Sequence, residues 1–402
     1  MFKKIFPVIL TVSLLSITIT CATHTSERDK KRELAEMVMD DIRDRTIAKA
    51  EKYLDKIPVT VTASVSDRSA GGPHDFYSEG DYWHPDPDNP DGPFIRKDGV
   101  RYEGRFEDDR LAMRRFAEIT AALASAWVAT GEQKYADHAL THMKAWFTDP
   151  ETLMNPNMLY AQAIKGRVTG RSIGLIDAYH LVEVAQSARI LTEGNAIPHD
   201  KAQRIKNWFG RFATWMTTHE YGIQEMQHYN NHAVTWAVTA AVMARTAVQE
   251  NIMELCRNRF AYVLLPEQMD QEGKFPYEIG RTKPYGYSLF NIDAFANLAW
   301  IISTEKKDFW TYVTHDGKSL GLGMDFIVPY IKNKDLWPYG EDIDIWEKWP
   351  VRHSSLLFAG LAFGNREYID LYLRFDPEPE HPEVLRNHPV RHPLIWMVDI
   401  LQ

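Results

Sequence analysis

The succession of helical segments from residue 108 to the end of the chain most constrains the fold. Apolar residues recur at helical intervals within each segment, and breakers such as Gly131, Pro198 and Gly364 separate one segment from the next. Alternation typical of β-strands is scarce, so the pattern predicts an all-α protein. The expected helices span residues 108–130, 133–147, 171–193, 199–218, 232–249, 251–264, 287–304, 318–332, 354–363, 365–374 and 392–401.

The order of these helices favours a ring-like arrangement. They come in pairs at irregular intervals and without a residue-level repeat, which argues against a short-repeat solenoid. Paired helices pack most economically in two layers, so we expect an (α/α)n toroid of about six to seven pairs, closed or incomplete. A helical array of another curvature is the alternative, because periodicity does not fix closure. With 402 residues, of which 45% are hydrophobic, we predict a single domain over residues 22–402.

The first 21 residues resemble a bacterial export signal. Lys3 and Lys4 precede an apolar stretch that is too short to span a bilayer comfortably, and small residues follow it. Cys21 stands where the cysteine of a lipoprotein would stand, so lipid anchoring there is one prediction, and ordinary cleavage near Ala22 is the other. We expect a periplasmic protein or an outer-membrane lipoprotein, with any membrane contact limited to the lipid anchor.

Charge and cysteine content restrict the partners. The formal net charge is −9 and no basic run occurs outside the N-terminus, so nucleic acid is not an expected partner, and an acidic polymer needs a local basic cleft. Besides Cys21 the chain has only Cys256, in an expected helix, so we predict no intramolecular disulfide and a core position for Cys256. Nothing in the sequence addresses the oligomeric state.

The segment from Pro58 to Glu107 differs from the helical part. It is rich in Pro, Gly, Asp and aromatic residues and has little periodicity, which predicts a long ordered loop. Loops of this length within a compact domain are usually functional, so we expect this one to lie over a cleft. It contains Tyr82, Trp83 and His84, and rings of Tyr and Trp stack well on sugars. Anchoring of the loop in the core explains some of these rings equally well.

The central motif is Asn230-Asn231-His232, directly before the alanine-rich run of residues 233–244. Asn230 or Asn231 is the expected N-cap of a buried helix. His232 then lies in the first turn, where the helix dipole disfavours imidazolium and keeps the ring able to accept a proton. A helix cap followed by a structural histidine is the alternative interpretation.

Two further segments carry candidate binding groups. Residues 275–291 bring Arg281, Lys283, Tyr285 and Tyr287 together just before a helix, and a tyrosine beside cations can act as acid and base. Residues 155–174 place cations, including Arg167 and Arg171, around glycines at a helix start, which suits a carboxylate or sulfate. Tyrosines packed on proline and a solvated basic turn are the respective alternatives.

Metal and hydrolase chemistry have weaker signals. His228 and His232 lack the intervening glutamate of a zinc-protease helix, so we predict no catalytic metal. A glycoside hydrolase needs two suitably separated carboxylates, and four acidic residues keep that option open. These are Glu278, Glu341, Asp342 and Asp344.

Four motifs in order resemble the alginate lyase family and related polysaccharide lyases with helical toroids. They are SEGDYWHPDP at 78–87 with PFIRKDG at 93–99, YAQA at 160–163 with GRSIG at 170–174, NNH at 230–232, and EIGRTK at 278–283 with GYSLFN at 286–291. The resemblance covers roughly residues 70–370. One departure is Trp83-His84-Pro85, where relatives often have Trp-Trp-Pro.

The resemblance implies roles for particular residues. His232 matches the base or the group that neutralises the uronate, and Asn231 matches the amide that holds the substrate carboxylate. Tyr287 matches the tyrosine that protonates the leaving oxygen and can also remove the proton, with Tyr285 as a nearby competitor. Arg281 matches the arginine that supports the tyrosine and the carboxylate. The substrate-binding candidates are Tyr82, Trp83, His84, Gln162, Arg167, Arg171, Asn230, Lys283 and Tyr285.

The expected activity is β-elimination on a 1,4-linked polyuronate, without a cofactor or metal. Removal of the weakly acidic C5 hydrogen needs a base, groups that neutralise the developing dianion and an acid for the O4 leaving group. Alginate containing mannuronate is the first expected substrate and glucuronan the second. A toroidal glycoside hydrolase and a noncatalytic glycan-binding lipoprotein are the competing classes.

Overall fold

The computed structural model describes residues 10–97 and 100–401, with side chains from residue 27 onward, and confirms a mostly helical chain with few strands. The helices are α1 (Leu10–Glu51), α2 (Asp108–Thr130), α3 (Gln133–Phe147), the 3₁₀ helix η1 (Ser172–Leu181), α4 (Val182–Glu193), α5 (His199–Thr218), α6 (Glu220–Met226), α7 (Asn231–Ala247), α8 (Glu250–Arg259), the π-helix η2 (Phe260–Leu264), α9 (Leu265–Gln268), α10 (Pro276–Ile279), α11 (Pro284–Ile302), α12 (Leu320–Lys332), the 3₁₀ helices η3 (Lys334–Leu336) and η4 (Trp346–Lys348), α13 (Ser354–Phe363), α14 (Arg366–Arg374), α15 (Pro382–Asn387) and α16 (Leu394–Leu401).

The residues at the helix ends explain why the boundaries fall where they do. α2 begins with Asp108 and Asp109, whose charges suit the positive end of the helix dipole, and it stops at Gly131, which adopts a φ of 72°. Gly364 ends α13 in the same left-handed conformation, with a φ of 61°. The predicted ranges 108–130, 133–147, 199–218 and 354–363 therefore match the structure. The predicted helix 171–193 is wrong in its first half, which is a 3₁₀ helix.

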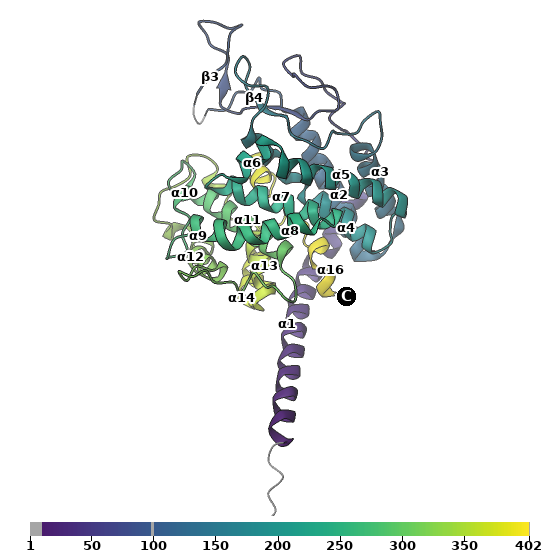
Figure 1. Cartoon of the computed structure of the whole chain (residues 1–402), viewed down its shortest axis with the longest axis vertical. Coiled ribbons are helices and arrows are strands. Elements are labelled where there is room, and N and C mark those ends of the chain that lie inside the picture. Colours follow the sequence, from purple (N-terminus) through teal and green to yellow (C-terminus); the bar gives the residue numbers. More distant parts are fainter. Residues whose placement is uncertain (1–9, 98–99, 402) are drawn as a thin grey trace, which may run out of the picture.

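The long loop carries short strands that hold it to a second loop. β1 (Tyr77–Glu79) pairs in parallel with β4 (Tyr160–Ala163), and β2 (Trp83–His84) pairs antiparallel with β3 (Ile95–Arg96). Figure 1 shows β3 and β4 at one end of the helical body, with the N-terminal part of α1 extending from the other end. The aromatic loop and the basic segment before η1 thus lie at the same end of the molecule.

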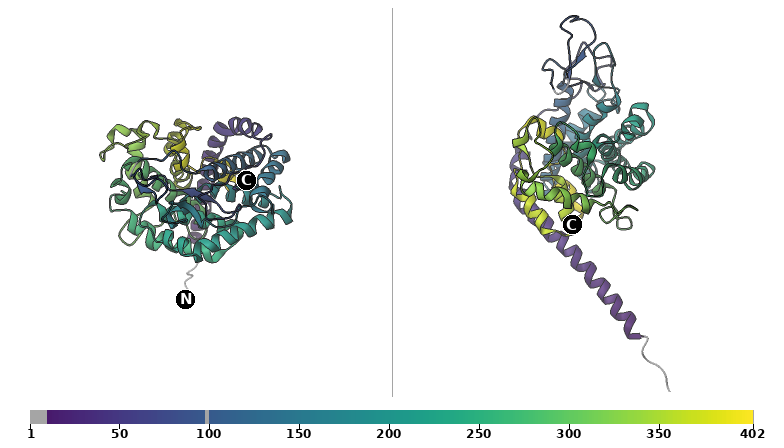
Figure 2. Two further views of the ribbon diagram at one scale, coloured as in Figure 1. Left: turned by 90° about the horizontal axis from the view of Figure 1, so that it is seen from above. Right: turned by 90° about the vertical axis from the view of Figure 1, so that its left-hand side faces the viewer.

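The larger helices contact one another in an order that returns to its start. α1 packs on α2, and the contacts continue through α4, α7, α11 and α13 back to α1. A second set of helices packs on these: α3 on α2, α5 and α8 on α7, α12 on α11, and α14 on α13 and α1. Seen from above, the colours run round the body in sequence order until the yellow and green segments lie near purple α1 (Figure 2).

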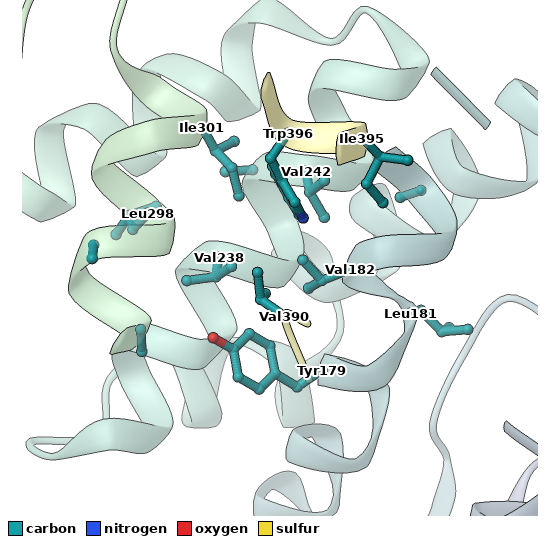
Figure 3. Close-up of a cluster of buried hydrophobic side chains, with 14 of the residues drawn as sticks. Tyr179, Leu181, Val182, Val238, Val242, Leu298, Ile301, Val390, Ile395 and Trp396 are labelled. Atoms are coloured by element: carbon teal, nitrogen blue, oxygen red, sulfur yellow. The ribbon is translucent and has the colours of Figure 1, made fainter. Parts of the chain in front are cut away.

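The C-terminal segment fills the middle of this ring of contacts. α16 packs on α1, α2 and α4, and Ile395 and Trp396 are almost completely buried. Figure 3 shows these two side chains among residues of α7 and α11, including Val238 and Leu298. The indole nitrogen of Trp300 donates to the carbonyl of Trp396 at 3.1 Å, so α16 is also hydrogen bonded to α11. The molecule therefore has one continuous hydrophobic core.

The predicted export signal falls largely outside what can be described. Residues 1–9 lie outside the described residues, and at Cys21 the structure describes the backbone as part of α1 but not the side chain. Within the described residues, no helix combines the length and apolar character that crossing a membrane requires. Cys256 is a free, buried residue of α8, as the sequence predicted.

Candidate functional site

The start of α7 presents the central motif as a packed helix cap. Asn230 is the N-cap, and its side-chain oxygen accepts a hydrogen bond from the backbone nitrogen of His232 at 3.3 Å. Gln268 donates to the backbone carbonyl of Asn230 at 3.0 Å, which fixes the cap from the other side. The predicted cap and the position of His232 in the first turn are confirmed. Asn230 is itself buried, so its part in the site is to fix the backbone of His232 at the helix start.

Asn231 is held by a buried carboxylate. Glu278 in α10 accepts the backbone N–H and the side-chain Nδ2–H of Asn231, both at 2.7 Å, and both residues are at most 2% exposed. Burial raises the pKa of Glu278, although the hydrogen bonds from Asn231 oppose the rise. The amide nitrogen of asparagine carries two hydrogens, so one N–H of Asn231 remains for a further acceptor.

His232 is oriented by a second buried carboxylate. Its Nδ1 lies 2.6 Å from Oε1 of Glu225 in α6, a residue that is 1% exposed. When the Nδ1 proton is donated to this carboxylate, the Nε2 lone pair is left to accept a proton. The ring of His228 lies 5.1 Å from that of His232, and burial lowers the pKa of His228. Sequence reasoning missed Glu225, because α6 is too short to give a periodic signal.

Arg281 connects the tyrosine to the asparagine. Its Cζ lies 3.8 Å from the centroid of the Tyr287 ring, a cation–π contact in the first turn of α11. The same guanidinium approaches Oε2 of Glu278 at 3.5 Å. The structure therefore joins Tyr287, Arg281, Glu278 and Asn231 by direct contacts. His232 directly follows Asn231 in the first turn of α7.

Tyr82 of the aromatic loop and Arg386 of α15 lie near Tyr287. Burial raises the pKa of Tyr82; the neighbouring Tyr287 adds to the rise, and Arg386 of α15 opposes it. Arg386 binds Asp81 at 2.7 Å and Glu383 at 2.8 Å. Sequence reasoning missed Arg386, which lies on a short helix about a hundred residues after Tyr287. The sequence signal for Arg386 was weak: it is a cation in a stretch without periodicity.

Lys283 lies beside the same group, in an acidic environment. Its Nζ is 3.4 Å from carboxylate oxygens of both Glu383 and Asp344. Glu383 is also the partner of Arg386, so the two cations share one buried carboxylate. The structure thus brings the predicted binding residues Tyr82 and Lys283 close to the predicted catalytic tyrosine.

The other binding candidates form a second cluster on the loops. Arg171 donates to the backbone carbonyl and the side-chain oxygen of Gln162, both at 3.0 Å. Gln162 has a φ of 51°, an uncommon conformation for a residue other than glycine, and Ser78 accepts its backbone N–H at 2.8 Å. The guanidinium of Arg167 lies 5.2 Å from the centroid of a ring of Trp83, so the loop tryptophan already packs on a cation.

Gly80 lets the aromatic loop pass close to this cluster. A Cβ on Gly80 would lie 2.9 Å from Nη2 of Arg171 and 2.8 Å from Cδ1 of Trp83. A larger residue would therefore displace Arg171 and Trp83. His84 has an anchoring contact instead, because its Nε2 is 2.9 Å from the carbonyl of Val100 and its ring packs on Tyr102.

The structure corrects the prediction for Tyr285. The side chain is completely buried, its hydroxyl donates to the carbonyl of Tyr330 at 3.1 Å, and its ring packs on Trp337 and Trp346. Residues two apart on an α-helix point to nearly opposite sides, about 200° apart. Tyr287 can therefore face the site only if Tyr285 faces the core. Tyr285 is a core residue and is closed to a substrate.

Two of the four carboxylates of the hydrolase hypothesis, Asp342 and Glu278, have structural partners. Asp342 accepts the backbone N–H groups of Tyr285 and Gly286, both at 2.9 Å, and so anchors the start of α11. Burial raises the pKa of Asp342 to about 6. Glu278 is engaged by Asn231. Neither carboxylate is arranged as a free acid facing a second one.

One group of potential metal ligands occurs in the described part of the chain. Asp293, His353 and His388 are buried, with one ligand atom each within 4.8 Å of the others. Asp293 lies further along α11 and is already hydrogen bonded to Nδ1 of His353 at 2.8 Å and to the backbone of Ser355 at 2.9 Å. Within the described part of the chain, none of these three residues contacts Asn231, His232 or Tyr287, so the group does not belong to the candidate active site.

Comparisons with known proteins give the family and the fold of the chain. The sequence profile described as alginate lyase matches residues 60–337. An alginate lyase structure from Bacteroides ovatus is 29% identical, with a TM-score of 0.77, and the match covers 92% of this chain and 97% of that one. Alginate lyase A1-III from Sphingomonas species A1 is 16% identical, with a TM-score of 0.53, over 82% and 89% of the two chains.

A further structure of alginate lyase A1-III, complexed with a tetrasaccharide, is 15% identical, with a TM-score of 0.51, over 77% and 80% of the two chains. At this identity the likeness concerns the fold. The comparison with curated proteins gives no match. The family profile nevertheless spans well over half of the chain and contains the aromatic loop, the central motif and the tyrosine segment. The chain therefore belongs to the alginate lyase family and is a polysaccharide lyase.

Proposed function

We propose that the protein cleaves 1,4-linked polyuronates by β-elimination and leaves 4,5-unsaturated uronate ends. Mannuronate-containing alginate is the first substrate and glucuronan the second. The observation that carries the proposal is the set of contacts through Glu278, which holds Asn231 on one side and approaches Arg281 on the other. Through Arg281 these contacts reach Tyr287, and His232 is the residue next to Asn231. The tetrasaccharide complex of the related A1-III structure supports a saccharide substrate.

The proposed mechanism assigns a separate task to each side chain. The free N–H of Asn231 and the guanidinium of Arg281 neutralise the carboxylate as the C5 proton leaves. Nε2 of His232, left free by the contact of Nδ1 with Glu225, is placed to take a proton or to share in that neutralisation. Tyr287 protonates the O4 leaving oxygen. The C4–O4 bond breaks as the C4–C5 double bond forms, so neither a redox step nor a covalent enzyme intermediate is needed.

Stereochemistry decides which residue acts as the base. Mannuronate and glucuronate differ only at C2, so both require syn elimination, and Tyr287 can serve as base and acid on one face. Guluronate requires anti elimination, with the base and the acid on opposite sides of the sugar. His232 and Tyr287 lie on different helices, α7 and α11, and together they offer that arrangement.

The cationic and aromatic residues around this group form the proposed substrate path. Trp83, stacked with Arg167, and the pair of Gln162 and Arg171 lie on the loops, while Tyr82 and Lys283 lie next to Tyr287. A polyuronate carries one carboxylate per sugar, so it needs both cations and ring-stacking surfaces along its length. The net charge of −9 makes these local cations important for attracting the polymer.

The same proposal covers the architecture and the location. We infer that the ring of helix contacts is an (α/α)n toroid, that residues 22–402 form one domain, and that the loop of residues 58–107 covers the cleft. The protein is exported through residues 1–21 and resides in the periplasm or on the outer membrane, anchored through Cys21 if that residue is lipidated. Metabolic labelling with a palmitate analogue, with Cys21→Ser as the control, tests the anchor.

Incubation with polymannuronate, polyguluronate and glucuronan tests the activity. A lyase produces unsaturated ends that absorb ultraviolet light, whereas a hydrolase produces reducing ends without that absorbance, and a binding protein produces neither. We expect Tyr287→Phe to lower kcat by about 10³-fold or more, since it removes an acid and base group. Full elimination activity in both Tyr287→Phe and His232→Ala would show that the site is wrongly assigned.

A further inference from the structure

A cavity of about 570 Å³ lies behind α15, between α1, α2 and the C-terminal segment. We call it the α15 cavity. Its charged lining comes from three distant parts of the sequence: Arg45 and Lys49 of α1, Arg114, Arg115 and Glu118 of α2, and Arg352, Glu378, Glu380, Arg391 and His392. Its volume falls in the range of small-molecule binding pockets, about 300–1,000 Å³.

α15 separates this cavity from the candidate active site. Arg386 of α15 forms an ion pair with Asp81, and its charge interacts electrostatically with the phenol groups of Tyr82 and Tyr287. Leu385, the preceding residue, lines the cavity, as does His388 just after the helix. Neither Asn231 nor Tyr287 lines the cavity, so it is distinct from the site described above.

The lining has more positive than negative charge. Six of the lining residues named above are Arg or Lys, and three are Glu. Although burial opposes its charge, Glu183 and Glu118 raise the pKa of His392 to about 9, so this residue is also charged at neutral pH. Lys49 and Arg391 both bind Glu118, so several cations share a single carboxylate. This sharing leaves the cavity with a surplus of positive charge.

Arg114 is a lining cation without a direct contact to a carboxylate, and Asp177 and Glu107 act on its charge only from a distance. Within the described residues it has no hydrogen bond and no ion pair, and its Nε is buried without a partner. Burial lowers the pKa of Arg114 to about 10, which still leaves the guanidinium charged at neutral pH. The adjacent Arg115 donates to the carbonyl of Ile57, so it does not share this feature. A charge removed from water needs a counter-charge or hydrogen bonds, and here the cavity is where one can enter.

We propose that the α15 cavity is a second binding site, which takes a short oligouronate with one carboxylate on Arg114. A guanidinium binds a carboxylate through two parallel hydrogen bonds, and the other lining cations match the further carboxylates of the oligosaccharide. The choice of ligand rests on the proposed function, which produces such oligosaccharides. The ligand would contact the segment that carries Arg386, at the back of the candidate active site.

Isothermal titration with a saturated mannuronate trisaccharide tests the proposal. The titrated protein is the full chain with Tyr287→Phe, in which turnover is suppressed. We expect two equivalents to bind, and we expect one of them to weaken at least tenfold when Arg114→Gln is added. Arg211→Gln is the control, because it removes an exposed positive charge from α5 and should leave both equivalents unchanged.

A second variant tests the cavity without altering a buried group. Leu111 lines the cavity and is 50% exposed, so both Leu111→Glu and Leu111→Gln should fold normally. The negative charge of Leu111→Glu should repel an anionic ligand, whereas the neutral Leu111→Gln should still bind it. Higher ionic strength should weaken the second equivalent. A single equivalent in the Tyr287→Phe chain would overturn the proposal. So would two equivalents that neither Arg114→Gln nor Leu111→Glu affects, or acetate binding to the cavity as tightly as the trisaccharide.

The two proposals can fail separately. Absence of unsaturated ends from the unaltered chain on every polyuronate would contradict the proposed function. A single bound trisaccharide on a chain that is otherwise fully active would contradict the cavity site alone. Arg114→Gln should leave elimination at low product concentration unchanged, since among the described residues Arg114 makes no hydrogen bond or ion pair with Asn231, His232, Arg281 or Tyr287.

Discussion

Two buried carboxylates orient neighbouring side chains of the candidate active site in different ways. Glu278 accepts two hydrogen bonds from Asn231 and so fixes both the backbone and the amide. Glu225 makes one short contact with Nδ1 of His232, and its second oxygen accepts no hydrogen bond within the described residues and lies 3.8 Å from Nε2 of His228. The first carboxylate therefore supports the fold and the site, whereas the second mainly selects the tautomer of the histidine.

We expect Glu225→Gln to lower kcat by about 10²-fold or more with little change in KM. The amide can accept or donate, so it no longer fixes the proton on Nδ1, and a wrong tautomer is costly in catalysis. The fold should tolerate the change, because the carboxylate it replaces is incompletely satisfied. Steady-state kinetics on polymannuronate and a thermal midpoint measure the two effects. An unchanged kcat would exclude a role for the tautomer of His232.

Glu278→Gln should lower both activity and stability. One of the two donors of Asn231 would then face an N–H group instead of an oxygen, and an unsatisfied buried donor costs about 1–3 kcal/mol. Displacement of Asn231 and Arg281 should lower kcat/KM by about 10²-fold. Urea unfolding and initial rates check these values. The exposed Glu305→Gln is the control and should behave like the unaltered chain, and equal behaviour of both variants would contradict the role of Glu278.

Sequence reasoning identified residue types better than their partners. Asn231, His232, Arg281 and Tyr287 stand out because an amide, an imidazole, a cation and a phenol gather at two helix starts and can together serve acid–base chemistry. Their roles stay predictions, while their proximity is a finding. Tyr285 was wrongly included because sequence spacing was read without the direction in which each side chain points. Glu225 and Arg386 were missed because they act across tertiary contacts.

At the scale of elements, the longer helices were predictable and the short ones were not. The ranges of α2, α3, α5 and α13 follow from apolar periodicity with glycine or proline at the ends. α6, α10 and α15 have four to seven residues each, less than two turns, so no period can be measured. These short helices supply Glu225, Glu278 and Arg386, so the unpredicted elements position much of the site.

The start of α11 depends on a glycine. A Cβ on Gly286 would lie 2.7 Å from Oδ2 of Asp342 and 3.0 Å from Nε1 of Trp349. We expect Gly286→Ala to lower the free energy of unfolding by about 1–3 kcal/mol, as overpacking does, and to lower kcat because Tyr287 is the next residue. Gly280→Ala is the matched control, since its Cβ would meet its nearest atom at 3.4 Å. Equal thermal midpoints in the two variants would contradict this account.

For the whole molecule, the all-α class was predictable from the sequence, but the packing of α16 among the other helices was not. Residues 392–401 looked like one more helix of the series, yet α16 lies among α1, α2 and α4. One signal was present: Leu394 to Val398 are apolar on every side, which is typical of a helix surrounded by protein. Periodicity alone could not show which helices surround it.

Acidification should destabilise the folded protein in a defined range. His142 is 1% exposed, and burial lowers its pKa to about 4 from the ordinary histidine value of 6.5. Between pH 6.5 and 4 the folded state binds fewer protons than the unfolded state, so stability falls as the pH falls. The loss from this residue is at most about 3 kcal/mol.

Urea unfolding at pH 7, 5 and 4 measures this loss. In His142→Gln the decrease should be smaller, because glutamine takes up no proton and its amide can still donate to the carbonyl of Lys56, which His142 contacts. The exposed His199→Gln serves as the control and should retain the full decrease. An identical decrease in all three proteins would show that His142 does not carry the effect.

The central position of α16 affects the order in which the protein can fold. Synthesis proceeds from the N-terminus, so α1, α2 and α4 leave the ribosome long before the residues that pack between them. Until Ile395 and Trp396 arrive, the inner faces of these helices have no apolar partner at that place. Completion of the core must therefore wait for the last residues of the chain. The export that we propose would benefit from this delay, because a chain that crosses a membrane unfolded must not complete its core beforehand.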